Sequence, residues 1–457
     1  MKELTIFCLC FFCLRTTCPT LLGQTNLPGL QLLRAEEDYR PLRNQYLDSG
    51  LERLKFLPIG DTASVSLGGE ARYLSELFRN NGWQAASGTT GWLLQRYMVH
   101  ADVRMGTFRL FGQLHSAWQS FTEEAPRSID EDQLDIHQLF LAYTVSLSNS
   151  QQLTLRLGRQ EFWLGSRRLV SVREGPNVRQ SFDAARLIYT FPNWRMDAIY
   201  ARLVDNKSGV FDNTSSADEQ WWSLYAVGNE LIGTLSFDFY YLGFYSTRRV
   251  YDQGNGTERR HTIGTRWWTD TPLRLNAEFA YQFGEFGTGT INAYTISLDI
   301  SKTLELPLEP TIGLRTELIS GDRDRDNPDL QTFNAFYPRG AYFGLIALIG
   351  PANLIDVHPF VSVPILPNLE FTFDWDVFWR HRTTDGIYGP NKALERSGRN
   401  SNQHYIGHQP GFEFAYQRGR YLSFSFEGSY FVSGPFFAET GSAADVFHFA
   451  AACRFKF

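Results

Sequence analysis

Apolar and polar residues alternate along most of the chain after about residue 62. In residues 92–105, one set of alternate positions is mostly apolar, and the intervening set contains Arg96, His100, Asp102 and Arg104. The same period of two recurs in residues 153–157, 274–283 and 371–380. This period is typical of β-strands with one apolar and one polar face, and no segment sustains the period of a helix. The pattern therefore predicts an all-β chain.

Short and long connections alternate between these expected strands. Short turns are expected near residues 105–108, 148–151, 192–193, 228–233, 269–272, 306–310, 364–368 and 417–420. Longer polar stretches lie between them, among them residues 79–90, 119–133, 206–218, 247–258 and 382–402. Such an arrangement is typical of a transmembrane β-barrel. Eight turns and nine loops predict an 18-stranded antiparallel barrel of the outer membrane, with short periplasmic turns and long extracellular loops.

Residues 340–353 are apolar enough to form a strand. A strand at this position would move the long 382–402 loop to the periplasmic side of the barrel. We therefore expect residues 340–353 to form a loop that folds into the lumen.

The C-terminal residues also alternate. Phe447, Phe449, Phe455 and Phe457 lie on one apolar face, and Arg454 lies on the other. A last strand that ends in Phe resembles the C-terminal signal of bacterial outer-membrane proteins. The barrel-assembly machinery, which reads that signal, is therefore an expected partner during biogenesis, and outer-membrane lipid is the expected surrounding.

Composition agrees with a membrane barrel and argues against other classes. Aromatic residues make up 15% of the 457 residues, charged residues 20%, and the mean hydropathy is −0.28. Beyond the N-terminus, no apolar run reaches the roughly 18 residues that a spanning helix needs. A polytopic helical membrane protein is therefore excluded, and the abundance of aromatic residues argues against disorder.

The N-terminus has the pattern of an export signal. Lys2 precedes an apolar stretch at residues 4–14, and Gly23 is a small residue before a polar one. These features predict a signal peptide over residues 1–23. Four of the five cysteines fall within it, so the mature chain would keep only Cys453 and have no intrachain disulfide. Residues 24–62, which do not alternate, are expected to form a periplasmic N-terminal segment, and residues 63–457 the barrel.

The polar faces of the expected strands carry many charges of both signs. Arginine supplies 37 of the 43 basic residues, and rings of basic residues are a usual device of anion pores. An 18-stranded barrel is wide enough for an aqueous channel. Ordinary salt bridges that rigidify the wall are the alternative interpretation. The expected lumen residues are Arg72, Arg96, Arg104, Arg109, Arg156, Arg186, Arg266, Arg274, Arg315 and Arg380, with Glu70, Asp102, Asp238, Glu278, Asp299, Glu317, Glu370, Asp374, Asp376, Glu413 and Glu427.

The densest cationic segment, residues 158–186, contains Gly158-Arg159-Gln160, then Asn177, then Phe182-Asp183. Further on lie Tyr342-Phe343-Gly344, Leu348-Ile349-Gly350, Asn353-Leu354, Phe378-Trp379-Arg380, Asp385-Gly386-Ile387-Tyr388 and Tyr405-Ile406-Gly407. This series resembles the alginate export porin family over most of residues 65–457.

The resemblance implies an outer-membrane channel that passively conducts an anionic, alginate-like uronic-acid polysaccharide or its fragments. It implies a lumen narrowed by basic residues and partly closed by loops. Separately, no cofactor and no enzymatic activity are expected, because the mature chain has no nucleophile elbow, phosphate loop or dinucleotide fingerprint. Carried onto this chain, the implied substrate-binding residues are Arg159, Arg167, Arg168 and Arg186, with Arg96, Arg104 and Arg380 as further lumen candidates.

Other functions remain open at this stage. The expected lumen is close to neutral, which leaves a general or nutrient-specific uptake porin for small anionic solutes as the main alternative. An outer-membrane lipid hydrolase would need a Ser/His pair, and no spacing selects one. His404 and His408 are a weak metal pair, so no metal site is expected, and nothing predicts a nucleic-acid partner.

Overall fold

The computed structural model describes residues 27–45, 47, 50–122 and 125–457. The expected signal peptide over residues 1–23, with its cleavage site after Gly23, lies outside the described residues.

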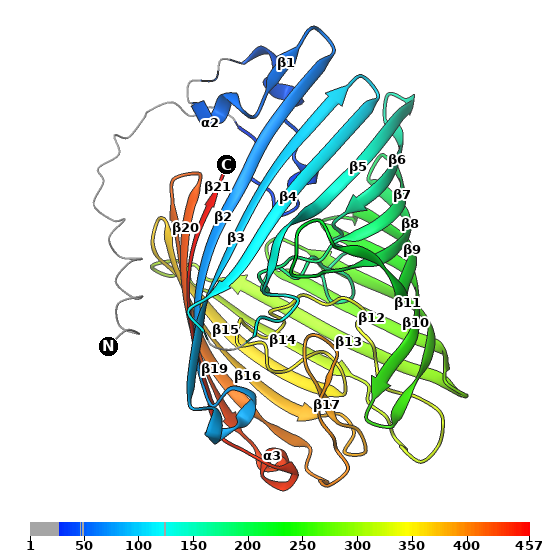
Figure 1. Ribbon diagram of the computed structural model, residues 1–457, viewed down its shortest axis with the longest axis vertical. Coiled ribbons are helices and arrows are strands. Elements are labelled where there is room, and N and C mark those ends of the chain that lie inside the picture. Colours follow the sequence, from blue (N-terminus) through cyan, green and yellow to red (C-terminus); the bar gives the residue numbers. More distant parts are fainter. Residues whose placement is uncertain (1–26, 46, 48–49, 123–124) are drawn as a thin grey trace.

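The chain forms a closed barrel of eighteen antiparallel strands, which confirms the predicted fold class (Figure 1). Consecutive strands are neighbours around the ring, and β2 pairs with the last strand, β21, with Ala71 opposite Phe455. The strands are β2 (Ala63–Arg79), β3 (Thr89–Met105), β4 (Phe108–Ser120), β5 (Asp132–Ser148), β6 (Gln151–Gln160), β7 (Phe182–Phe191), β8 (Trp194–Asp205), β9 (Thr214–Ile232), β10 (Leu235–Tyr251), β11 (Gly254–Thr269), β12 (Arg274–Phe286), β13 (Gly289–Thr303), β14 (Thr311–Ile319), β15 (Leu354–Leu366), β16 (Leu369–Arg380), β19 (Tyr405–Arg418), β20 (Leu422–Ser433) and β21 (Val446–Lys456).

Short elements flank the barrel strands. Strand β1 (Leu57–Ile59) pairs with β2, and β17 (Ile387–Tyr388) pairs with β18 (Leu394–Arg396). In the described part of the chain, no helix is long and apolar enough to cross a membrane. The helices are η2 (Arg34–Glu36), η3 (Arg40–Asn44), α2 (Gly50–Arg53), η4 (Asn81–Trp83), η5 (Ala85–Ser87) and α3 (Pro435–Thr440).

The alternation of the sequence separates an outer face from a lumen face. On β3, Val99 is 56% exposed and Met105 is 59% exposed, whereas Arg96 is fully buried and Asp102 is nearly so. The exposed set is apolar, as the lipid-facing surface of a membrane barrel requires. The expected distribution of β3 side chains between outer face and lumen is confirmed.

The eight short turns lie at the end of the barrel that carries β1, and α3 and β17 mark the opposite end (Figure 1). The prediction of a long loop at residues 247–258 is wrong, because β10 and β11 continue through this stretch and join at residues 252–253. Alternate polar residues of this stretch face inward and form ion pairs, as Glu258 Oε1 does with Arg260 Nε of β11 at 2.6 Å. A polar run is therefore compatible with strand here. The connection between β12 and β13 is equally short.

Two extracellular connections fold into the lumen. They are the third loop, L3 (residues 161–181), and the seventh loop, L7 (residues 320–353). Tyr342 and Phe343 of L7 are buried, and β15 begins only at Leu354. The expectation that residues 340–353 form a loop inside the barrel is confirmed.

Candidate functional site

Loops L3 and L7 form a layer across the lumen. Val170 of L3 and Tyr337 of L7 form an isolated parallel bridge. The Tyr337 backbone N–H donates to the Leu169 carbonyl at 2.8 Å. The Tyr337 ring also packs edge-on against Phe182 of β7, with ring centroids 5.1 Å apart. These contacts attach the two loops to each other and to the wall, so the layer is a defined constriction.

Cavities lie on both sides of this layer. On the extracellular side, a cavity of about 240 Å³ is lined by Trp83, Trp92, Arg173 and residues 345–348. On the periplasmic side, a cavity of about 600 Å³ is lined by Glu413 and Arg454. A second one of about 360 Å³ is lined by Arg274, and both periplasmic cavities reach Glu370. A solute that crosses the barrel must pass between them through the L3–L7 layer.

Arg72 and Arg96 hold L3 against the wall. The Arg72 guanidinium donates to the backbone carbonyls of Glu174 and Pro176 at 2.8 and 2.9 Å. Arg96 Nη2 lies 2.6 Å from carboxylate oxygens of both Glu70 and Glu174. Because Arg96 is fully buried between two carboxylates, its charge is already compensated by the chain.

The N-terminal segment, residues 27–59, supplies partners for a second group of arginines. Glu36 Oε1 lies 3.1 Å from Arg156 Nη1 and 3.9 Å from Arg186 Nη1. Asp38 Oδ1 lies 3.5 Å from Arg104 Nη1, and Arg104 also donates to a backbone carbonyl of the segment. An acidic stretch of the chain therefore occupies arginines that the sequence assigns to the lumen.

The same arginines explain the ionisation of the acidic stretch. Burial alone would raise the pKa of the Glu36 carboxyl, but Arg156, Arg186 and Arg195 outweigh it and hold the pKa well below its usual value. Burial opposes ionisation of Asp38 too, and hydrogen bonds from Arg40 with the charge of Arg104 lower its pKa to about 2. Both groups are therefore carboxylates at neutral pH.

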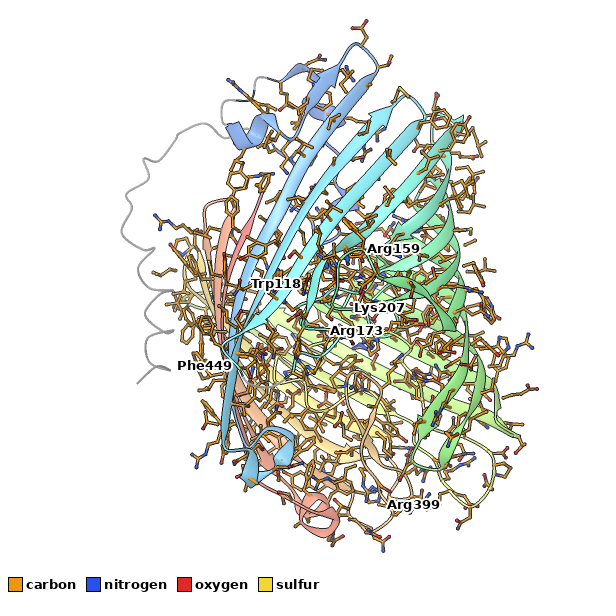
Figure 2. The ribbon with its side chains drawn as sticks, viewed as in Figure 1. Trp118, Arg159, Arg173, Lys207, Arg399 and Phe449 are labelled. Carbon is orange, nitrogen blue, oxygen red and sulfur yellow. The ribbon has the colours of Figure 1, made fainter. Side chains whose placement is uncertain are left out.

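Arg159, Arg168 and Arg186 also have carboxylate partners on the barrel strands. Arg159 Nε lies 2.9 Å from Asp183, and Arg186 Nε lies 2.7 Å from Asp197. Arg168 Nε of L3 lies 3.2 Å from Glu317 of β14. In the view of Figure 2, Arg159 lies about midway along the barrel. The Arg168–Glu317 pair joins L3 to the wall, and the other two pairs link neighbouring wall strands.

Arg167 differs from the other predicted arginines. Its guanidinium stacks over the Trp163 ring at 4.3 Å, and among the described residues no carboxylate forms an ion pair with it. It is partly exposed, and the nearby charges that act on it are those of Arg339 and Arg266. A cation stacked on an aromatic ring, with other cations beside it, suits an incoming anion.

Arg380 binds backbone carbonyls of the connection between β16 and β19. Its guanidinium donates to the backbone carbonyls of Thr383, Asp385, Ser401 and Gln403. It is fully buried and lies over the Phe436 ring at 4.3 Å. Six of the seven predicted arginines thus form ion pairs with carboxylates or hydrogen bonds with several backbone carbonyls. The Arg167 guanidinium remains available to a solute.

Two charged regions were not singled out from the sequence. One is the acidic stretch Glu36-Glu37-Asp38, whose signal would have been three successive carboxylates in a segment that precedes an arginine-rich barrel. The other is an acidic region of the lumen across the ring, of whose five carboxylates four were expected lumen residues but were not recognised as a group. We call the lumen side of β3–β8 the arginine wall and the lumen side of β15–β20 the acidic wall. The acidic wall contains Asp356, Asp374, Asp376, Glu413 and Glu427.

His404 and His408 do not form a joint site. His404 Nδ1 lies 2.8 Å from the Arg380 carbonyl, and His408 Nδ1 lies 2.7 Å from the Tyr405 hydroxyl. His404 precedes β19, and the pairing with β16 shifts register between these two histidines. Residues four positions apart on a regular strand lie on one face, and the register shift disrupts that geometry here.

The comparison with protein families decides the classification. The model of the family described as "Alginate export" matches residues 63–451. The chain belongs to the alginate export family. The match begins with β2 and ends within the last strand, β21, so this member of the family is an outer-membrane channel. No curated protein matches it.

Solved porins share the fold of this alginate export family member. OccK9 (OpdG) of Pseudomonas aeruginosa has a TM-score of 0.58 at 15% identity, covering 86% of this chain and 98% of the porin. A BenF-like porin from Pseudomonas fluorescens Pf-5 has a TM-score of 0.56 at 11% identity, with the same coverage. OccK2 (OpdF) of P. aeruginosa, solved in complex with glucuronate, has a TM-score of 0.54 at 13% identity, covering 86% and 98%. At these identities the likeness concerns the fold.

Proposed function

We propose that the protein passively conducts an anionic uronic-acid polysaccharide or its fragments across the outer membrane. The observation that carries the proposal is that the arginine wall forms ion pairs with the acidic stretch of the N-terminal segment. Arg104, Arg156 and Arg186 bind Asp38 and Glu36 of one short segment. A surface that accommodates closely spaced carboxylates of its own chain has the charge pattern needed for a polymer with one carboxylate per sugar.

Conduction along this wall would be an exchange of partners. A uronate chain that enters the vestibule loses part of its hydration, and the guanidiniums offer replacement hydrogen bonds. Each contact must also release, since a multi-site pore conducts only when binding is weak enough for the ion to leave. The N-terminal segment occupies these contacts, so the polymer must displace at least Glu36 and Asp38.

Arg167 is the proposed contact within the constriction. It belongs to L3 at the layer where L3 and L7 meet, and its backbone carbonyl accepts a hydrogen bond from Arg339 of L7. With no carboxylate partner among the described residues, its guanidinium can bind a uronate without first breaking an ion pair. The six other predicted arginines already have carboxylate or carbonyl partners, so a uronate would bind them directly only by displacing those partners.

A second candidate function is uptake of small anionic solutes. The L3–L7 layer narrows the lumen, and the extracellular cavity of about 240 Å³ suits a single sugar better than a polymer. The similar porin OccK2 was solved with glucuronate, itself a single uronate. This observation favours the same ligand chemistry at a smaller size.

Single-channel recording of the refolded protein in a planar bilayer under a salt gradient tests both functions. For a polymer channel, we expect anion-selective current that oligouronates block more strongly as they lengthen, whereas neutral oligosaccharides do not block it. Equal block by glucuronate and by longer oligouronates would favour uptake of small solutes. Cation-selective current without uronate block would contradict both proposals.

The variant Arg167→Gln tests the proposed contact. We expect it to weaken uronate block at least about tenfold, since a desolvated charge-assisted hydrogen bond contributes roughly 1.5–3 kcal/mol. Arg323→Gln is the matched control, because Arg323 is an exposed arginine at the start of L7. Equal block in the wild type and Arg167→Gln would remove Arg167 from the pathway.

A further inference from the structure

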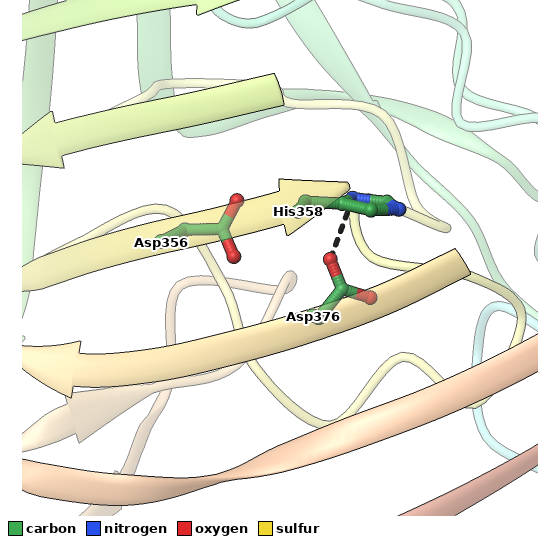
Figure 3. Close-up of side chains that lie close together, drawn as sticks. All are labelled: Asp356, His358 and Asp376. Atoms are coloured by element: carbon green, nitrogen blue, oxygen red, sulfur yellow. Dashed lines mark ion pairs between the residues drawn. The ribbon is translucent and has the colours of Figure 1, made fainter. Parts of the chain in front are cut away.

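Three potential metal ligands meet on the acidic wall. Asp356 and His358 lie on β15 and Asp376 lies on β16, and all three side chains are buried (Figure 3). One ligand atom from each lies within 4.8 Å of those of the other two. Asp356 and His358 are two positions apart on a strand, so both point to the lumen face. The strand pairing of β15 with β16 brings Asp376 beside them.

The Asp356 carboxylate is poorly satisfied by the rest of the chain. Asp356 Oδ1 is buried and has no hydrogen-bond partner in the described structure. On the neighbouring strand β14, the residue directly opposite Asp356 is another acid, Glu317. Arg168 already contacts the Glu317 carboxylate. A buried carboxylate without a partner is costly. In the described structure, Asp356 therefore has no ion-pair partner at the point where the three side chains converge.

The imidazole is held as a metal ligand usually is. Its Nδ1 lies 2.6 Å from Asp376 Oδ1, and its Nε2 lies 3.2 Å from Asp374 Oδ2 on the outer side of the cluster. In metal sites, the second ring nitrogen of a ligating histidine commonly faces a carboxylate or carbonyl that fixes the ring orientation. Asp374 is suitably placed for this role, which leaves Nδ1 directed at the cluster.

We propose that Asp356, His358 and Asp376 bind one divalent transition-metal ion, such as Zn²⁺. Two carboxylates and one imidazole form a mixed oxygen and nitrogen donor set, which suits such ions. Ca²⁺ and Mg²⁺ prefer oxygen ligands alone. A doubly charged ion would neutralise the two carboxylates. This site goes beyond the proposed function, because it does not depend on which solute crosses the channel.

The position of the site gives the ion a structural consequence. Gln409 on β19 donates to the Phe343 carbonyl of L7 at 2.8 Å, and its amide lies 3.4 Å from Asp376 Oδ2. Tyr342 of L7 donates to Glu317, the cross-strand neighbour of Asp356. The ion would thus lie in the wall directly beside the contacts that hold L7. We expect bound metal to stabilise the barrel as well as to fill the site.

Metal binding by the refolded full chain tests the proposal. After treatment with EDTA and removal of the chelator, equilibrium dialysis against Zn²⁺ followed by elemental analysis should give one equivalent per chain. Asp356→Asn and Asp376→Asn should each weaken binding at least about tenfold, since both remove a charged ligand. The matched control is Asp132→Asn, which alters a buried aspartate 2.8 Å from His115 outside any group of three potential ligands found in the described structure.

A measurement on the wild type covers the case in which a variant does not refold. X-ray absorption at the zinc edge of the loaded protein should show one imidazole among oxygen ligands. An absence of stoichiometric Zn²⁺ binding would overturn the proposal and leave a protonated His358–Asp376 pair as the state of the cluster. Unchanged affinity in folded Asp356→Asn, or a zinc spectrum without imidazole, would also overturn it.

Discussion

The arginine wall and the acidic wall lie on different sides of the same lumen, and they differ in how many of their charged side chains have ion-pair partners. On the arginine wall, Arg96, Arg104, Arg156 and Arg186 all have carboxylate partners, some of which come from L3 or the N-terminal segment. On the acidic wall, among the described residues, His358 is the ion-pair partner of Asp374 and Asp376, and the other three carboxylates have none. The number of arginines therefore does not measure the field that a solute meets.

This difference separates structural charges from available ones. A buried guanidinium between carboxylates is weak evidence for binding, since it already satisfies its neighbours. An unpaired charge attracts whatever mobile ion can reach it. On this reasoning, Arg167 and the acidic wall influence the ion selectivity of the channel more than the numerous paired arginines do. Those paired arginines include several that the family resemblance implies as substrate ligands.

The largest expected effect comes from removing a cation from the arginine wall. Arg96→Met removes the cation shared by buried Glu70 and partly exposed Glu174. Glu70 keeps Lys456 at 3.6 Å and Glu174 keeps Arg454 at 2.9 Å. We therefore expect the free energy of unfolding to fall by about 3 kcal/mol, the low end of the cost of breaking a buried pair. Urea unfolding of the protein in lipid vesicles measures it. The control is Arg315→Met, which breaks a partly exposed 3.7 Å pair with Asp299 and should cost less than about 1 kcal/mol. Equal losses would show that the two pairs do not differ.

A smaller effect is expected from acid, which acts on the acidic stretch. When the N-terminal segment is docked on the arginine wall, the pKa of the Glu36 carboxyl is held well below its usual 4.5. The pKa of the Asp38 carboxyl is lowered from 3.8 to about 2. Groups with a depressed pKa stabilise the docked state above the undocked pKa and lose that effect as pH falls through the docked pKa. The contribution is complete above about pH 4.5 and is lost toward pH 2. We expect docking to weaken at least about tenfold over this range.

Conductance recorded from pH 7 to pH 3 measures this release. If the N-terminal segment obstructs the lumen, current should rise below pH 4.5 in the wild type. The variant Glu36→Gln, which lacks the titrating carboxylate, should show part of that increase already at pH 7. A wild-type conductance independent of pH, with Glu36→Gln unchanged, would show that the segment does not control the pore.

The fold was largely predictable from the sequence because membrane strands repeat one simple pattern. Alternation on β3 separates outward residues such as Val99 from lumen residues such as Arg96, and glycine, proline and asparagine mark many of the short turns. The failure at residues 247–258 has the same origin. A lumen-facing strand end and a solvated loop are both polar, so composition alone cannot separate them.

The candidate site was less predictable because it depends on partners that lie far apart in the chain. Arg156 and Glu36 are 120 residues apart, and Arg96 and Glu174 are 78 apart. A count of charges says which residues face the lumen but not which of them neutralise each other. The metal candidate had a weak local signal, Asp356 and His358 two positions apart on one strand, but the third ligand comes from the pairing of β15 with β16.

The smallest expected effect comes from removing a charge from the acidic wall. Glu413 on β19 lies directly opposite Glu427 on β20, and like charges in that position repel. Glu413→Gln keeps the shape and removes one charge, so we expect unfolding in urea to require about 0.2–1 kcal/mol more free energy. The recorded current should shift toward anions. Glu427 is left intact because it accepts a hydrogen bond from the Leu345 backbone N–H of L7 at 2.6 Å. A loss of stability in Glu413→Gln would mean that its carboxylate has an attractive partner, and the acidic wall would then resemble the arginine wall.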